Sequence, residues 1–237
     1  MSLMARLMNV FAGPGEVFED VKASPPAASN WLMPALLFAL VGLISVMIIF
    51  SQPSIVQPLI EQQAKGLDAA VKAGKMTQDQ ADKAEKFMGP TVFKISGGIF
   101  AVVGSFVRLL WWALILWLLG KVLRRRFGYG KALEVTGLAS MITVLGGIVA
   151  LLLIMNFSKL SATPSLALII KDFDMTRKSH LFLGTINVFY FWQIVVFSVG
   201  LARLANVSFT RAMPLVLVCW MLQEVLFILL GLGQLAL

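Results

Sequence analysis

The stretch from Ile95 to Gly120 carries a single charged side chain, Arg108. A helix of this length is long enough to cross a hydrocarbon core of about 30 Å. A soluble domain could not bury such a run within a chain that is 59% hydrophobic and only 14% charged, because most of a small domain's surface still faces water. The stretch therefore predicts a helix that spans a membrane.

Four further apolar runs are long enough to cross the same layer. The predicted crossings are about 31–50, 95–120, 133–155, 181–204 and 213–235. The first run lacks a convincing signal-peptide cleavage site, so we expect it to be kept as a membrane anchor. We predict an all-α, polytopic integral membrane protein with five transmembrane helices, in which residues 31–237 form the membrane domain.

Two segments outside these runs have helical patterns of their own. Residues 1–30 are predicted to form an amphipathic N-terminal segment and a linker that contains Pro25 and Pro26. Residues 51–90 form a polar insert, in which Thr77 and Gln80 have the spacing of a capping box. We expect this insert to be a helical hairpin outside the bilayer.

Orientation is predicted from the distribution of positive charge. The densest basic segment is the short turn after the second crossing, with Lys121, Arg124, Arg125, Arg126 and Lys131. Short basic loops stay in the cytoplasm. We predict that the protein lies in the inner membrane of the cell. The rule then places the N-terminus in the cytoplasm, and the C-terminus and the 51–90 hairpin on the extracytoplasmic side. The lysines of 51–94 alternate with acidic residues, and the total number of lysine and arginine residues hardly differs between the two sides. The orientation is therefore predicted from the clustering of positive charge in short loops.

The net charge of +8 is assigned to these membrane-facing turns. Anionic lipid is attracted to such basic segments. We predict no nucleic-acid partner, and the sequence indicates no oligomeric state.

Two opposite charges lie near the middle of predicted crossings, Arg108 in the second and Glu224 in the fifth. An isolated charge there costs at least about 2.5–3.5 kcal/mol, so we expect the two to pair, supported by Asn187, Gln193 and Gln223. One interpretation is a structural clamp between the two helices. The alternative is a small transporter or channel that uses both residues in a polar path. We favour the clamp, because no further acidic relay accompanies the pair, and expect exchanging the charges to preserve folding better than neutralising either.

No arrangement of residues in the sequence supports catalysis. The chain has one histidine and one cysteine, Cys219, and no cluster with metal-ligand spacing. We therefore predict a protein that is not an enzyme, with no catalytic residue, cofactor or metal. Glu134, at the edge of the third crossing, is expected to pair with Lys131 or to reach the membrane surface.

Several short motifs carry a family resemblance. They are NVFAGPGEVFEDV at 9–21, Trp31-Leu-Met-Pro34, and FGYGKALEVTGLASMITVLGG at 127–147. The chain resembles bacterial members of the Yip domain family, named for proteins that interact with Ypt/Rab GTPases. The resemblance implies a cytoplasmic N-terminus, and eukaryotic members act as membrane adaptors in vesicle traffic. It implies a membrane scaffold or adaptor that binds cytoplasmic partners or anionic lipid, although this N-terminal segment is too short for the GTPase role to be carried over.

Overall fold

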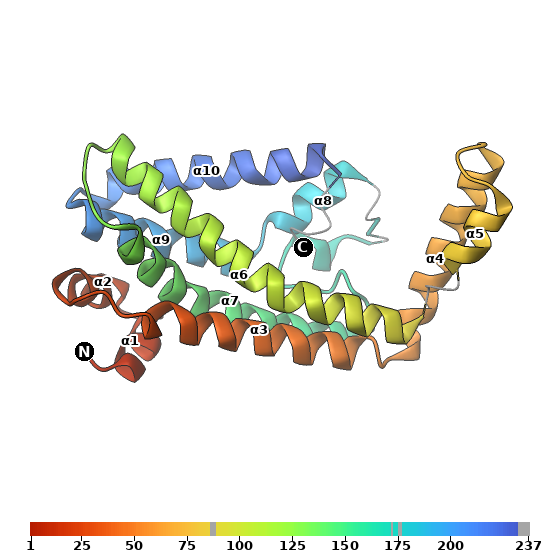
Figure 1. Cartoon of the computed structure of the whole chain (residues 1–237), viewed down its shortest axis with the longest axis horizontal. Coiled ribbons are helices and arrows are strands. Elements are labelled where there is room, and N and C mark those ends of the chain that lie inside the picture. Colours follow the sequence, from red (N-terminus) through yellow and green to blue (C-terminus); the bar gives the residue numbers. More distant parts are fainter. Residues whose placement is uncertain (86–88, 172, 175–176, 232–237) are drawn as a thin grey trace.

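The computed structural model describes residues 1–85, 89–171, 173–174 and 177–231. Within these ranges the chain is helical, and its only β-structure is one isolated bridge. The predicted all-α fold class is confirmed. The helices labelled in Figure 1 are α1 (Leu3–Asn9), α2 (Pro14–Ala23), α3 (Ser29–Ile49), α4 (Pro53–Lys72), α5 (Gln78–Glu85), α6 (Pro90–Val122), α7 (Tyr129–Phe157), α8 (Lys178–Thr185), α9 (Val188–Ala205) and α10 (Phe209–Leu229), and a 3₁₀ helix, η1, covers Leu166–Ile169.

Five of these helices, α3, α6, α7, α9 and α10, are long and apolar enough to cross a membrane. Their outward faces carry large apolar side chains such as Leu40, Val103 and Leu222, each at least half exposed. Water-soluble proteins rarely expose apolar surface on this scale, whereas lipid tails are as apolar as these side chains. The chain is therefore a multi-pass membrane protein, and its outer faces contact the bilayer.

The membrane helices approach most closely where glycine leaves room for a neighbouring backbone. A Cβ atom added at Gly137 in α7 would lie 2.2 Å from the Cα of Trp31 in α3, so these two helices touch backbone to backbone. A Cβ added at Gly42 in α3 would lie 3.1 Å from the Cβ of Ala101 in α6. Small residues commonly bring membrane helices together in this way. Helix α3 thereby packs along both α6 and α7.

The N-terminal segment packs into the bundle. Val17, Phe18 and Val21 of α2 are fully buried and belong to the same hydrophobic core as α6, α7, α9 and α10. Helix α2 lies against α9 and α7 at one end of the molecule (Figure 1). Residues 1–23 therefore form a layer of the folded bundle rather than a separate peripheral segment.

The predicted crossing at 181–204 is interrupted in the structure. Helix α8 ends at Thr185, and α9 begins at Val188. Between them, the Ile186 carbonyl accepts from the Leu166 N–H, and the Val188 N–H donates to the Pro164 carbonyl. Helix α9 keeps 18 residues, which at 1.5 Å per residue span about 27 Å, close to the thickness of the hydrocarbon core.

The insert between α3 and α6 contains two helices, α4 and α5, which project from the end of the molecule opposite α1 and α2 (Figure 1). The capping box before α5 is present: the Thr77 N–H donates to Oε1 of Gln80 at 2.9 Å, and the Gln80 N–H donates to Oγ1 of Thr77 at 3.3 Å. Residues 86–88 of the predicted 51–90 hairpin lie outside the described residues.

Candidate functional site

The ammonium group of Lys131 connects α7 to the end of α2. Its Nζ donates to the carbonyl oxygens of Val21 and Ser24, at 2.6 and 2.7 Å. These carbonyls lie at the C-terminal end of α2, where unpaired acceptors and the helix dipole favour a cation. The same Nζ lies 3.0 Å from Oε1 of Glu134. Lys131 therefore points into the protein, although the sequence placed it in the surface basic turn.

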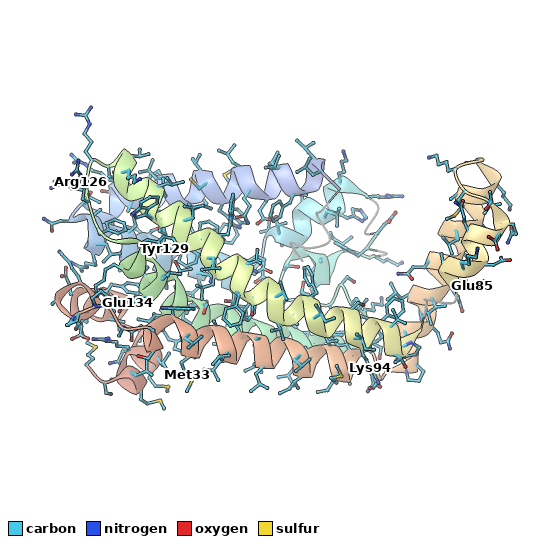
Figure 2. The ribbon with its side chains drawn as sticks, viewed as in Figure 1. Met33, Glu85, Lys94, Arg126, Tyr129 and Glu134 are labelled. Carbon is cyan, nitrogen blue, oxygen red and sulfur yellow. The ribbon has the colours of Figure 1, made fainter. Side chains whose placement is uncertain are left out.

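Glu134 is a buried carboxylate with partners on two helices. Only 1% of its surface is exposed, and besides Lys131 it accepts a 2.5 Å hydrogen bond at Oε2 from Nδ2 of Asn30, the second residue of α3. A buried charge is stable only where such partners replace the lost water. The expected pairing with Lys131 is confirmed, and Figure 2 shows Glu134 at the end of the bundle that carries α1 and α2.

A second ionic cluster holds α1 against α2. Arg6 is buried; its Nε donates to Oδ2 of Asp20 at 2.8 Å, and its Nη2 donates to Oγ of Ser24 at 2.9 Å. The amine of Met1 lies 2.8 Å from Oδ1 of Asp20. The amine first, and then Arg6, hold the pKa of Asp20 below its usual value. Stability that comes from a lowered pKa is lost only as the pH falls through that pKa. The ion pairs of Asp20 with Arg6 and the Met1 amine therefore persist down to a pH below the ordinary pKa range of carboxyl groups.

Arg108 forms its polar contacts with α9. Its Nη2 lies 3.4 Å from Oε1 of Gln193, and its guanidinium carbon lies 4.8 Å from the centre of the Tyr190 ring, a cation–π distance. Gln193 in turn donates from Nε2 to Oγ1 of Thr143 in α7 at 3.4 Å. Arg108 therefore joins α6 to α9, and through Gln193 to α7.

Glu224 of α10 is 5% exposed, and its Oε1 accepts from Nε2 of Gln223 at 3.1 Å. Gln223 also accepts a 2.7 Å hydrogen bond from the indole N–H of Trp111 in α6. In the described part of the chain, Oε2 of Glu224 has no hydrogen-bond partner, and no ion pair joins Glu224 to Arg108.

In place of the direct ion pair expected from the sequence, each charge contacts a glutamine: Arg108 contacts Gln193, and Glu224 contacts Gln223. Matching depth along two helices does not fix the direction in which each side chain points. Asn187, expected to support the pair, caps α9 instead: its Oδ1 accepts from the Phe189 N–H at 2.9 Å.

The rest of the basic turn faces outward. Arg124, Arg125 and Arg126 are exposed, and Lys121 is also exposed with its Nζ 3.5 Å from the centre of the Trp117 ring. Figure 2 shows Arg126 projecting from the same end of the molecule as Glu134. Three arginines without an ion-pair partner among the described residues therefore lie in the turn between α6 and α7, at this end of the molecule.

In a comparison with known protein families, the family model of the Yip1 domain matches residues 8–232. The chain belongs to the Yip1 domain family. The resemblance found in residues 9–21 and 127–147 is confirmed. No curated protein and no solved structure is significantly similar to the chain.

Two buried polar residues were missed as site residues, Arg6 and Asn30. Arg6 is buried because α2 covers it, and helical periodicity within residues 1–30 does not indicate that packing. Asn30 directly precedes Trp31 and the first apolar run. A buried amide needs a polar partner, but the partner, Glu134, is 104 residues away in the sequence, so the sequence gives no signal for this contact.

Replacing Glu224 by glutamine is expected to leave the free energy of unfolding of this Yip1-domain protein unchanged, or to raise it by about 1 kcal/mol. The amide keeps the acceptor for Gln223 and removes a buried charge that has no direct counter-ion. Thermal unfolding in detergent would measure the change, with Glu134→Gln as the comparison, because Glu134 does have a cationic partner. A marked loss of stability in Glu224→Gln alone would show that Glu224 forms a direct ion pair in the membrane.

Proposed function

We propose that this protein is a non-enzymatic membrane scaffold or adaptor of an inner membrane, with α1, α2 and the basic turn facing the cytoplasm. The observation that carries the proposal is the attachment of residues 1–24 to the bundle: Lys131 of α7 binds the end of α2, and Arg6 holds α1 against α2. This attachment forms a composite face at one end of the molecule from α1, α2, the α6–α7 turn and the α9–α10 turn (Figure 1). A fixed face of this kind suits recognition of a partner, because little ordering is needed on binding.

The exposed side chains of this face define what it would bind. Arg124, Arg125, Arg126 and Arg211 supply positive charge, and Met4 and Met8 of α1 are 67% and 64% exposed. Arginine binds phosphate and carboxylate groups through paired donors, and methionine adapts to varied apolar surfaces. The face therefore fits an acidic cytoplasmic protein segment or the headgroups of anionic lipid.

The transporter alternative depends on the Arg108–Glu224 layer and is favoured by the unpartnered Oε2 of Glu224. Against it, the cavity that Arg108 lines with Ser105 and Gln193 has a volume of about 10 Å³, which corresponds to roughly one water molecule. Such a volume suits a packed contact better than a substrate path. Proteoliposome flux that is abolished by Glu224→Gln would favour transport over the scaffold.

Site-specific photocrosslinking in cells tests the scaffold function. A photoreactive residue at Met8 or Arg126 is expected to give discrete protein or anionic-lipid adducts, because both side chains lie on the composite face. The same residue at Lys72, which is exposed at the opposite end on α4, is the control. Equal adduct patterns at all three positions, or no adducts at Met8 and Arg126, would contradict the proposal.

A further inference from the structure

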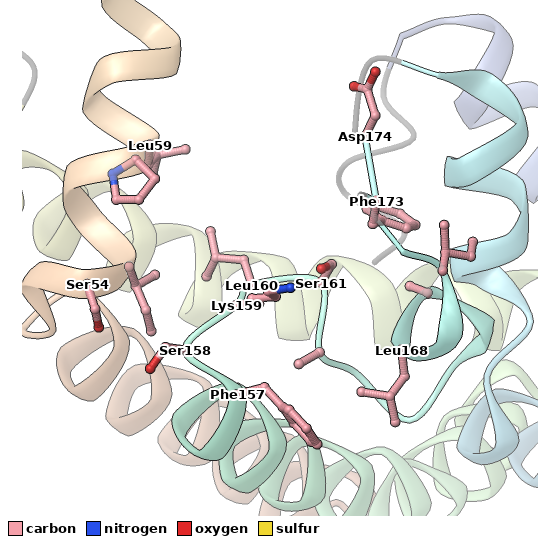
Figure 3. Close-up of a pocket in the computed structure, with 15 residues that line it drawn as sticks. Ser54, Leu59, Phe157, Ser158, Lys159, Leu160, Ser161, Leu168, Phe173 and Asp174 are labelled. Atoms are coloured by element: carbon pink, nitrogen blue, oxygen red, sulfur yellow. The ribbon is translucent and has the colours of Figure 1, made fainter.

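A cavity of about 610 Å³ lies at the end of the molecule opposite α1 and α2. It is bounded by the start of α4, the loop that follows α7, and the segment around η1 (Figure 3). Its volume is within the range of small-molecule sites in proteins. Neither the composite face nor the Arg108 layer includes it, so it requires an interpretation of its own.

The cavity has one polar group of side chains. Figure 3 shows Lys159 and Ser161 in the loop after α7, with Ser158 beside them and Ser54 across from them on α4. None of these four side chains has a hydrogen-bond or ion-pair partner among the described residues. Asp174, on the far wall, pairs with Arg177 at 3.3 Å. The cavity therefore presents one cation and three hydroxyl groups, together with one carboxylate on the far wall that Arg177 pairs. The cation and the hydroxyl groups match an anionic oxygen-rich group.

The remaining walls are apolar and lie where α7 leaves the membrane. Leu59, Leu160 and Ile170 line the cavity together with Phe157, the last residue of α7. Next to it, Ile169 on η1 is 77% exposed, and Leu168, itself a lining residue, is 39% exposed. Apolar side chains this exposed at the end of a membrane helix are expected at the boundary between headgroups and acyl chains. A ligand entering from this level would carry an acyl chain.

We propose that this cavity binds the headgroup of an anionic phospholipid from the adjacent leaflet, with Lys159 holding its phosphate and the apolar walls holding the first part of a chain. The site is separate from the composite face and does not depend on the scaffold function. Lys159 is the residue that selects for negative charge, and the serine hydroxyls donate to the remaining phosphate oxygens.

Photolabelling of the purified full-length protein tests this proposal. The probe is phosphatidylglycerol with a diazirine in its acyl chain, and adducts are located by peptide mass spectrometry. We expect adducts on residues 157–170, reduced about tenfold in Lys159→Ala, since a charge-assisted hydrogen bond is the stronger kind. Lys159→Arg should retain them. Lys72→Ala, which alters an exposed lysine of α4 outside the cavity, should leave them unchanged.

Three further experiments distinguish lipid binding in this cavity from nonspecific lipid labelling, from binding of free phosphate and from lipid binding at the composite face. A phosphatidylcholine probe should label 157–170 much less, and a large excess of inorganic phosphate should not displace the lipid. The triple variant Arg124→Gln, Arg125→Gln, Arg126→Gln should remove labelling only at the opposite end, which distinguishes failure of this site from failure of the scaffold function. Equal labelling in Lys159→Ala and wild type, equal labelling by both lipids, or displacement by phosphate alone would overturn the proposal.

Discussion

Replacing Gly137 by alanine is expected to lower the free energy of unfolding by about 3 kcal/mol or more, at the upper end of overpacking effects. The added methyl group would lie 2.2 Å from the Cα of Trp31 and 2.8 Å from the Asn30 carbonyl oxygen, so backbone atoms would have to move. Moving α3 away from α7 would also pull Asn30 from Glu134. Thermal unfolding in detergent, followed by size-exclusion chromatography, measures the loss.

Gly147→Ala is the matched control for this substitution, because Gly147 lies on the same helix. Its added Cβ would meet only Cγ1 of Val41, at 3.4 Å, an ordinary contact. Alanine favours a helix over glycine by about 0.8–1 kcal/mol, so the control should equal or slightly exceed wild type. Similar melting of the two variants would show that α3 and α7 do not touch at Gly137.

Replacing Lys131 by methionine is expected to cost about 3–5 kcal/mol, the usual effect of removing one partner of a buried ion pair. Glu134 would lose its cation, and the Val21 and Ser24 carbonyls would lose their donor. Helix α2 should then separate more easily from α7. Thermal unfolding would report the lost stability, and limited trypsin digestion at Lys22 would report the separation.

Lys121→Met is the control for this prediction, because Lys121 is an exposed lysine stacked on Trp117 and its removal leaves no buried charge. The double variant Lys131→Met, Glu134→Gln should recover part of the stability, since it removes the uncompensated carboxylate. Wild-type melting and wild-type digestion of Lys131→Met would rule out this ion pair as the attachment of α2.

The membrane helices could be predicted from sequence because the bilayer imposes a simple physical requirement. A run such as 95–120 must satisfy every backbone group internally, and in a single chain segment only a helix does so. The break before α9 was missed, although Asn187 has a recognisable signal, an N-cap residue in front of an apolar run. The partners that close the break, Pro164 and Leu166, come from a distant loop that periodicity does not place.

The polar contacts were harder to predict than the helices. Lys131 and Glu134 are three residues apart on one helix, and this local pair was predicted correctly. The direct Arg108–Glu224 contact was predicted from opposite charge and matching depth. In the structure the two charges instead contact Gln193 and Gln223, which were expected only to support the pair. Arg6 acquires its partners only when α1 packs against α2, and Asn30 acquires its partner only when α3 packs against α7. No pattern within any one of these segments indicates these contacts.

The double attachment of Lys131 has a mechanical consequence. The ammonium group of Lys131 connects the last turn of α2 to the first turn of α7 and pairs with Glu134. Asn30, at the start of α3, binds the carboxylate of the same Glu134. A pulling force applied to residues 1–24 would therefore reach both α3 and α7 directly, without first extending a flexible linker. The force needed to peel α2 away, measured on single molecules in a bilayer, would report the strength of that joint.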